Sequence, residues 1–290
     1  MAWVPPGGEQ SAGDGVDPPR PPVVVSGSPV THFDGGSGPT VLFLHGWALG
    51  PGAYREPLRR LAAAGCRVLC PAQPGFAGTP ELPAADRHFE GYAAWAARYL
   101  DAVGVDGEVV VAGHSFGGGV AIRFAHDHPG RVRAAVLCNA VGGPALVGVD
   151  GPLPMAKRSL WEWGQRFGAD LLAPGAAPRV WPAVLPVAAA NLVVNPMAVW
   201  RVASFVRRAD LLDELAVVGR RRLPVSVVWS DRDRLVPRSG YSAMVEAADA
   251  LGVTVPGHHN WLIAEPDRFV DLMLQAVAAC GALEETLAVG

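Results

Sequence analysis

The chain has 290 residues, of which 50% are hydrophobic and 18% are charged, and its formal net charge is -3 at pH 7. This length and composition are typical of a globular enzyme with one large core, and they argue against long disordered acidic or basic tracts. No basic run is present, which argues against nucleic acid or an anionic membrane as a partner, and no apolar segment is long enough to span a bilayer.

Residues 1–22 are rich in glycine, proline, aspartate and serine. Such a composition buries too little apolar surface to offset the entropy of ordering, so we expect a flexible tail. The first residues also lack the basic start and apolar run of an export signal, and we therefore expect a cytoplasmic protein.

The next part of the chain predicts alternating strands and helices. Two short β-prone runs, Val23–Val25 and Val30–Phe33, are expected to form an antiparallel edge. After them, buried strands are predicted at Thr40–His45, Arg67–Cys70, Glu108–Ala112 and Ala134–Cys138, and helices near Tyr54–Ala64, Phe89–Val103 and Phe116–His126. This alternation is typical of an α/β fold with a mostly parallel, doubly wound sheet.

The alternation stops over residues 142–215, where five aromatic residues stand among proline-punctuated helical stretches: Trp161, Trp163, Phe167, Trp181 and Trp200. We interpret this region as an inserted helical cap, or lid. The alternation returns with a strand at Val225–Trp229, a helix near Gly240–Ala250, a strand at Val253–Val255 and a closing helix from Pro266 to about Ala279. The predicted α/β core therefore comprises residues 23–141 and 216–290.

The motif Gly113-His114-Ser115-Phe116-Gly117 fits the pattern G-x-S-x-G. It lies between a predicted strand and a predicted helix, which is the setting that a nucleophile elbow requires. A serine hydroxyl needs a nearby imidazole base, and that base needs a carboxylate that fixes its tautomer. His258 and His259 are both candidates for the base, and Asp231 and Asp233 are both candidates for the acid.

Four sequence blocks together resemble the α/β-hydrolase superfamily, in particular its esterase-like and lipase-like members with a helical cap. The blocks are Leu44-His45-Gly46-Trp47, Gly113 to Gly118, Trp229 to Pro237 and Gly257 to Trp261. By this resemblance the catalytic residues are Ser115, Asp233 and His259, in the superfamily's chain order of serine, acid and histidine. Ser230 departs from the family pattern, because relatives have glycine at this place.

The resemblance also implies two backbone amides that stabilise an oxyanion, those of Trp47 and Phe116. No cofactor and no metal are implied. As substrate contacts we assign five residues around the predicted pocket: His45, Gly46, His114, Trp161 and Trp163. The aromatic cap indicates a pocket roof with apolar character.

These features predict a serine hydrolase that cleaves carboxylic ester bonds of small, mostly apolar substrates. Serine members of the same fold that hydrolyse carbon-carbon bonds or thioesters are alternatives, and so is a ligand-binding protein with vestigial turnover. The natural substrate, the acyl-chain preference and the oligomeric state do not follow from the sequence.

Overall fold

The computed structural model describes residues 22–143, 165, 168 and 177–281. The predicted tail, apart from Pro22, lies outside the described residues. So do Trp161 and Trp163, the two cap residues assigned to substrate binding.

A seven-stranded sheet forms the centre of the chain, with the strand order β3-β5-β4-β6-β7-β8-β9. Its strands are β3 (His32–Gly35), β4 (Thr40–Leu44), β5 (Arg67–Pro71), β6 (Val109–His114), β7 (Val132–Cys138), β8 (Val225–Ser230) and β9 (Leu251–Val255). Only β3 pairs antiparallel, and the other six strands run parallel. The predicted α/β fold with a mostly parallel sheet is confirmed.

The N-terminal edge differs from the expectation. Strands β1 (Val23–Val25) and β2 (Ser28–Val30) form a separate two-stranded hairpin, and β3 alone joins the main sheet, against β5. The turn between β1 and β2 is tight, with both Ser26 and Gly27 at positive φ. The two β-prone runs are therefore divided among three short strands rather than two.

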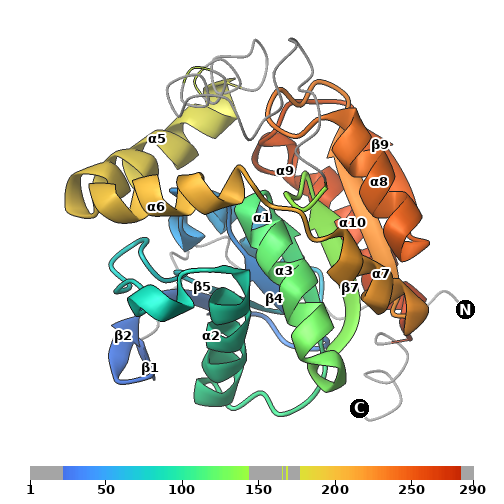
Figure 1. Cartoon of the computed structure of the whole chain (residues 1–290), viewed down its shortest axis with the longest axis horizontal. Helices are drawn as coiled ribbons and strands as arrows, with labels where there is room; N and C mark the ends of the chain where they lie inside the picture. Colours follow the sequence, from blue (N-terminus) through green and yellow to red (C-terminus); the bar gives the residue numbers. More distant parts are fainter. Residues whose placement is uncertain (1–21, 144–164, 166–167, 169–176, 282–290) are drawn as a thin grey trace, which may run out of the picture.

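Helices cover both faces of the sheet (Figure 1). One face carries α2 (Phe89–Ala102), α3 (Phe116–Asp127), α7 (Leu212–Arg220) and α8 (Arg238–Ala248), and the other carries α1 (Arg55–Ala63), α9 (Trp261–Ala264) and α10 (Pro266–Ala279). Short 3-10 turns lie at η1 (Pro51–Tyr54), η2 (Ala84–Asp86) and η3 (Pro129–Arg131). The sheet therefore lies between two helical layers, each with its own apolar core.

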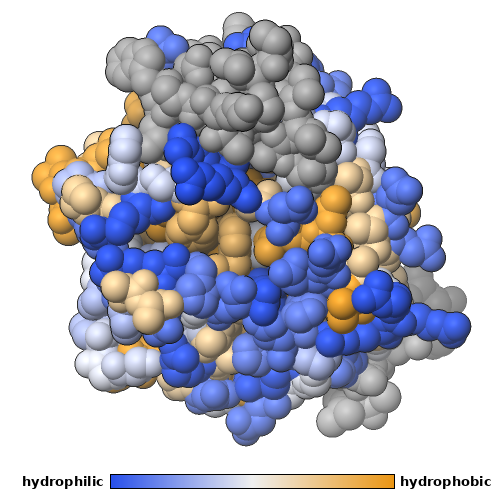
Figure 2. All heavy atoms as spheres, in the orientation of Figure 1, coloured by the Kyte–Doolittle hydropathy of each residue, from blue (hydrophilic) through white to orange (hydrophobic). Residues whose placement is uncertain are grey.

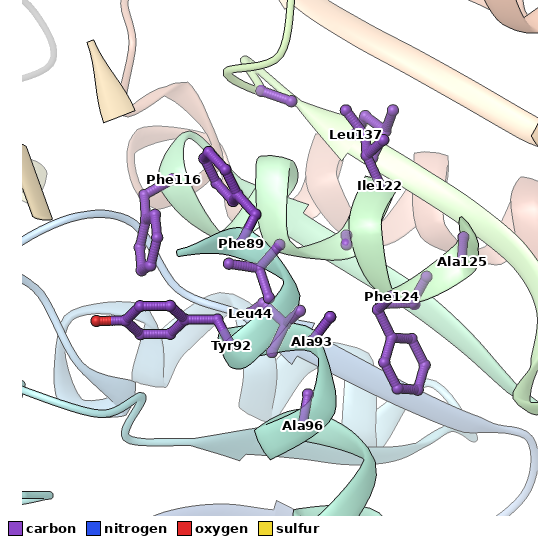
Figure 3. Packing of buried hydrophobic residues seen from close by; sticks show 14 of the residues in the cluster. Leu44, Phe89, Tyr92, Ala93, Ala96, Phe116, Ile122, Phe124, Ala125 and Leu137 are labelled. Carbon is purple, nitrogen blue, oxygen red and sulfur yellow. The ribbon is translucent and has the colours of Figure 1, made fainter. Parts of the chain in front are cut away.

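Alternate strand residues feed these two cores. Leu42 and Leu44 of β4 pack into the cluster with α2 and α3, whereas Val41 and Phe43 pack into the cluster with α1 and α10. The reason is geometric, because successive side chains of a strand point to opposite faces. Figure 3 shows the first core, where side chains of α2 and α3 meet one another beside Leu44.

Two described helices belong to the predicted cap, α5 (Ala177–Val194) and α6 (Pro196–Val206). Asn191 fixes α5 to the core, since its side chain accepts from the Ala77 amide at 2.7 Å and donates to the Ala48 carbonyl at 2.8 Å. Helix α7 packs on α3 and α8, so the helical layer of the core begins at Leu212, inside the region assigned to the cap.

The outer faces of α5 and α6 are apolar where the two helices meet (Figure 2). The exposed residues there are Leu192, Val193, Val194, Met197 and Trp200. In the described part of the chain, no single helix is long and apolar enough to cross a membrane. The bent pair Pro178–Val194 and Pro196–Val206, which turns by 107°, meets that test by length and composition alone.

Candidate active site

Ser115 lies in a strained turn between β6 and α3. Its backbone has φ 54° and ψ −116°, a conformation that costs a non-glycine residue on the order of 1–3 kcal/mol and persists only where neighbours enforce it. Here the Ser115 amide donates to the Cys138 carbonyl at 3.0 Å, and the Ser115 carbonyl accepts from the amides of Gly118 and Val141 at 3.0 and 3.1 Å. The turn is therefore held by β7 as well as by the helix that follows it.

Close backbone contact explains the second glycine of the motif. A Cβ atom built on Gly117 would lie 2.1 Å from the carbonyl oxygen of Leu44 at the end of β4. Only a residue without a side chain lets α3 approach the sheet this closely. The same approach brings the serine to the carboxyl edge of the parallel strands, where β8 and β9 also end.

Asp233 is a buried carboxylate held by four donors. Its Oδ1 accepts from the amides of Leu235 and Val236 at 2.7 and 3.0 Å, and its Oδ2 accepts from the His259 ring at 2.8 Å and from the Asn139 amide group. Burial raises the pKa of this carboxyl. The charge and hydrogen bond of His259, with the Val236 and Asn139 hydrogen bonds, outweigh burial and hold that pKa below its usual range.

The Asp233 contact also fixes the tautomer of His259. An ionised carboxylate only accepts hydrogen bonds, so Nδ1 of His259 carries the proton, and Nε2 of the neutral ring is an acceptor. Asp231 is instead exposed and accepts from the Gly257 amide at 2.9 Å. Of the four candidates for acid and base, the structure pairs His259 with Asp233.

Asn139 is a residue of this site that the sequence reasoning missed. Its Nδ2 donates to Asp233 and, at 2.7 Å, to the Ser230 hydroxyl, and its Oδ1 accepts from the Trp261 indole at 2.8 Å. The Ser230 hydroxyl donates to the His258 carbonyl at 2.9 Å. The serine that departs from the family pattern therefore joins the loop after β8 to the loop that carries the histidine. The serine in place of glycine at position 230 was the signal in the sequence that could have pointed to this network.

A pocket opens beside Ser115 and His259. The described residues that line it are Gly46, Trp47, Leu49, His114, Ser115, Ala203, Val206, Leu235, His259 and Asn260. Ala203 and Val206 come from α6, so a cap helix forms part of the wall. The contact between the Ser115 hydroxyl and His259 Nε2 stays a prediction, and such bonds often tighten only when substrate binds.

His45 does not line this pocket, so its assignment as a substrate contact is corrected. It is fully buried, its Nδ1 donates to the Gly46 carbonyl at 2.9 Å, and its Nε2 accepts from the Gln73 amide at 2.9 Å. Both ring nitrogens are therefore engaged, and the Nε2 bond joins the loop after β4 to the loop after β5. The Phe116 side chain lies in the apolar core, and its amide, the first of α3, has no acceptor within the helix.

Within the described part of the chain, no three histidine, cysteine, aspartate or glutamate side chains lie together in a way that could hold a metal ion.

Two buried histidines make the stability of the fold depend on pH. Burial lowers the pKa of His45 to about 4 and that of His114 to about 3. In the unfolded chain both rings take up a proton below about pH 6.5, whereas in the folded chain they stay neutral to lower pH. Each ring therefore stabilises the fold fully above pH 6.5, and this contribution is lost as the pH falls toward the folded pKa.

We predict that the free energy of unfolding decreases between pH 6.5 and 5 by up to about 1.4 kcal/mol per pH unit for each of the two rings. Urea titrations at several pH values would measure the slope. A His114→Gln variant should lose about half of it. A slope that is equal in the variant and the wild type would contradict the assignment of a buried, neutral His114.

Known proteins are similar to this chain in sequence and in fold. Residues 41–272 match the model of the Alpha/beta hydrolase family. A putative non-heme haloperoxidase of Mycobacterium phage D29 is 27% identical over 83% of this chain and 88% of its own length. A 2-hydroxy-6-oxo-6-phenylhexa-2,4-dienoate hydrolase of Burkholderia cepacia is 32% identical over 42% of this chain, and the match spans 43% of that protein.

Among solved structures, a thermophilic esterase from Thermogutta terrifontis superimposes with a TM-score of 0.68 at 22% identity, over 89% of this chain and 98% of the esterase. At that identity the likeness concerns the fold. The family match covers most of the chain and includes the turn at Ser115 and the loops of Asp233 and His259. The chain belongs to the alpha/beta hydrolase family.

Proposed function

We propose that this hydrolase cleaves carboxylic ester bonds of small, mostly apolar substrates through an acyl-enzyme on Ser115. The observation that carries the proposal is the buried Asp233–His259 pair, whose histidine lines the same pocket as a serine held in a strained turn. A hydroxyl, an imidazole of fixed tautomer and a carboxylate are the groups that acyl transfer requires.

In the proposed first half-reaction, Ser115 Oγ attacks the acyl carbon while His259 Nε2 takes the hydroxyl proton. The amides of Trp47 and Phe116 donate to the oxyanion of the tetrahedral intermediate. His259 then gives its proton to the alcohol oxygen, which leaves as the carbon-oxygen bond breaks. In the second half-reaction, His259 takes a proton from water, the water oxygen attacks the acyl carbon, and Ser115 is released with its proton restored.

The lining of the pocket supports an uncharged, mostly apolar acyl group. The pocket wall includes five apolar side chains, those of Trp47, Leu49, Ala203, Val206 and Leu235, and no arginine, lysine, aspartate or glutamate among the described residues. Such a wall disfavours a phosphorylated or polyanionic substrate.

The first test measures kcat on nitrophenyl acetate for variants of the three proposed catalytic residues. Variants of the adjacent His258 and of Asp231 are the matched controls. Ser115→Ala and His259→Gln should lower kcat by roughly a thousandfold or more, and Asp233→Asn by about as much, because its amide favours the wrong tautomer of the histidine. His258→Gln and Asp231→Asn should stay within about threefold of the wild type. Wild-type turnover that survives Ser115→Ala would sink the proposal.

The second test concerns acyl-group size. Ala203→Phe should fill part of the pocket and lower kcat/KM for hexanoate and benzoate esters about tenfold relative to acetate. Ser204→Phe is the matched control, since Ser204 is the next residue on α6 and does not line the pocket. An equal loss on all three esters in Ala203→Phe would mean that Ala203 supports the fold rather than the acyl group.

Hydrolysis of a carbon-carbon bond is the second candidate, favoured by the 32% identity to the dienoate hydrolase. The dienoate in the name of that hydrolase contains no ester bond. Turnover of 2-hydroxy-6-oxo-6-phenylhexa-2,4-dienoate with a kcat/KM above that for the best ester would favour this function over ester cleavage.

A further inference from the structure

A series of hydrogen bonds runs through His114, the residue directly before Ser115. His114 Nε2 lies 2.9 Å from the carbonyl oxygen of His259, and His114 Nδ1 lies 2.7 Å from the hydroxyl of Tyr54. The Gly46 amide donates to that same hydroxyl at 3.0 Å. Two buried side chains, those of Tyr54 in η1 and His114 at the end of β6, therefore connect the loop after β4 to the loop after β9.

The direction of every bond in this series follows from its ends. The His259 carbonyl only accepts, so His114 Nε2 carries the proton, and Nδ1 of the neutral ring accepts from the Tyr54 hydroxyl. The Tyr54 oxygen then accepts from the Gly46 amide. Burial favours this arrangement, because it keeps His114 neutral and raises the pKa of the Tyr54 phenol, so that the hydroxyl keeps its proton.

Packing around this series of hydrogen bonds leaves little freedom. A Cβ atom on Gly46 would lie 2.9 Å from the Tyr54 hydroxyl and 3.1 Å from His114 Nδ1. The rings of His114 and His259 also pack with centroids 4.8 Å apart. His114 is only 1% exposed, which suits a residue that supports its neighbours.

We propose that Tyr54 and His114 are positioning residues, which hold the Trp47 amide and the His259 imidazole in register with Ser115. This inference rests on the proposed function, in which Trp47 donates to the oxyanion and His259 is the base. Gly46 directly precedes Trp47, and the His259 carbonyl belongs to the base itself. Without these hydrogen bonds, the Trp47 amide and the His259 imidazole would be held less firmly. The loss would weaken binding of the transition state more than binding of the substrate.

The test is Tyr54→Phe, assayed on nitrophenyl acetate and by the rate at which a fluorophosphonate labels Ser115. The variant removes one hydroxyl and leaves the Gly46 amide and His114 Nδ1 without it. We expect kcat and the labelling rate to fall about tenfold or more, with KM within about twofold.

Tyr99→Phe is the matched control. Tyr99 is also a buried tyrosine whose hydroxyl lies 2.8 Å from a histidine ring, that of His32, but it is outside the active site. It should cost similar thermal stability and leave kcat within about twofold of the wild type. Equal kcat values for Tyr54→Phe and the wild type would overturn the inference, and so would a loss confined to KM.

His114 variants provide a second readout. His114→Gln keeps a donor toward His259 and an acceptor toward Tyr54, so it should retain more kcat than His114→Leu. The double variant Tyr54→Phe/His114→Leu should lose no more kcat than the worse single variant, because both act through one series of hydrogen bonds. Additive losses of kcat in the double variant, or equal kcat values for His114→Gln and His114→Leu, would contradict the proposed positioning role. If the wild type neither turns over ester nor labels at Ser115, the proposed function fails and the inference fails with it.

Discussion

The backbone hydrogen bonds that hold Ser115 at positive φ determine where the rest of the site lies. The Ser115 amide is held by the end of β7, and its carbonyl receives amides from α3 and from Val141. Because Gly117 lets α3 touch the end of β4, the strained turn is enclosed by three strands of one sheet edge. The strain is supported by the parallel sheet, so the hydroxyl does not depend on a flexible loop for its position.

The polar groups of the site have hydrogen-bond partners within the core, whereas its apolar side chains line the pocket. Four donors hold the Asp233 carboxylate, and Asn139 and Ser230 join the loops that carry the acid and the histidine. A buried charge of this kind persists only when its lone pairs are engaged. The wall above is mainly apolar and partly built from α6, which lets the cap vary substrate choice while the polar network stays unchanged.

The sequence predicted the fold well because the buried parallel strands are continuous apolar runs, and the turn at Ser115 has its own glycine signature. It divided the N-terminal edge wrongly, since β1, β2 and β3 are only three or four residues long and too short to show a clear alternation. It missed Tyr54 and Asn139, because their contacts join segments far apart in the chain. It assigned His45 to the pocket, whereas the hydrogen bonds that engage both of its ring nitrogens form only when the loops fold.

Rapid quenching during turnover of nitrophenyl benzoate, followed by mass mapping of peptides, would detect an acyl-enzyme on Ser115. One benzoyl group per chain should accumulate on the peptide that contains Ser115 before steady state, and none should accumulate in Ser115→Ala. Turnover without any acylated peptide, or acylation of another residue at the same rate as turnover, would contradict the proposed acyl-enzyme.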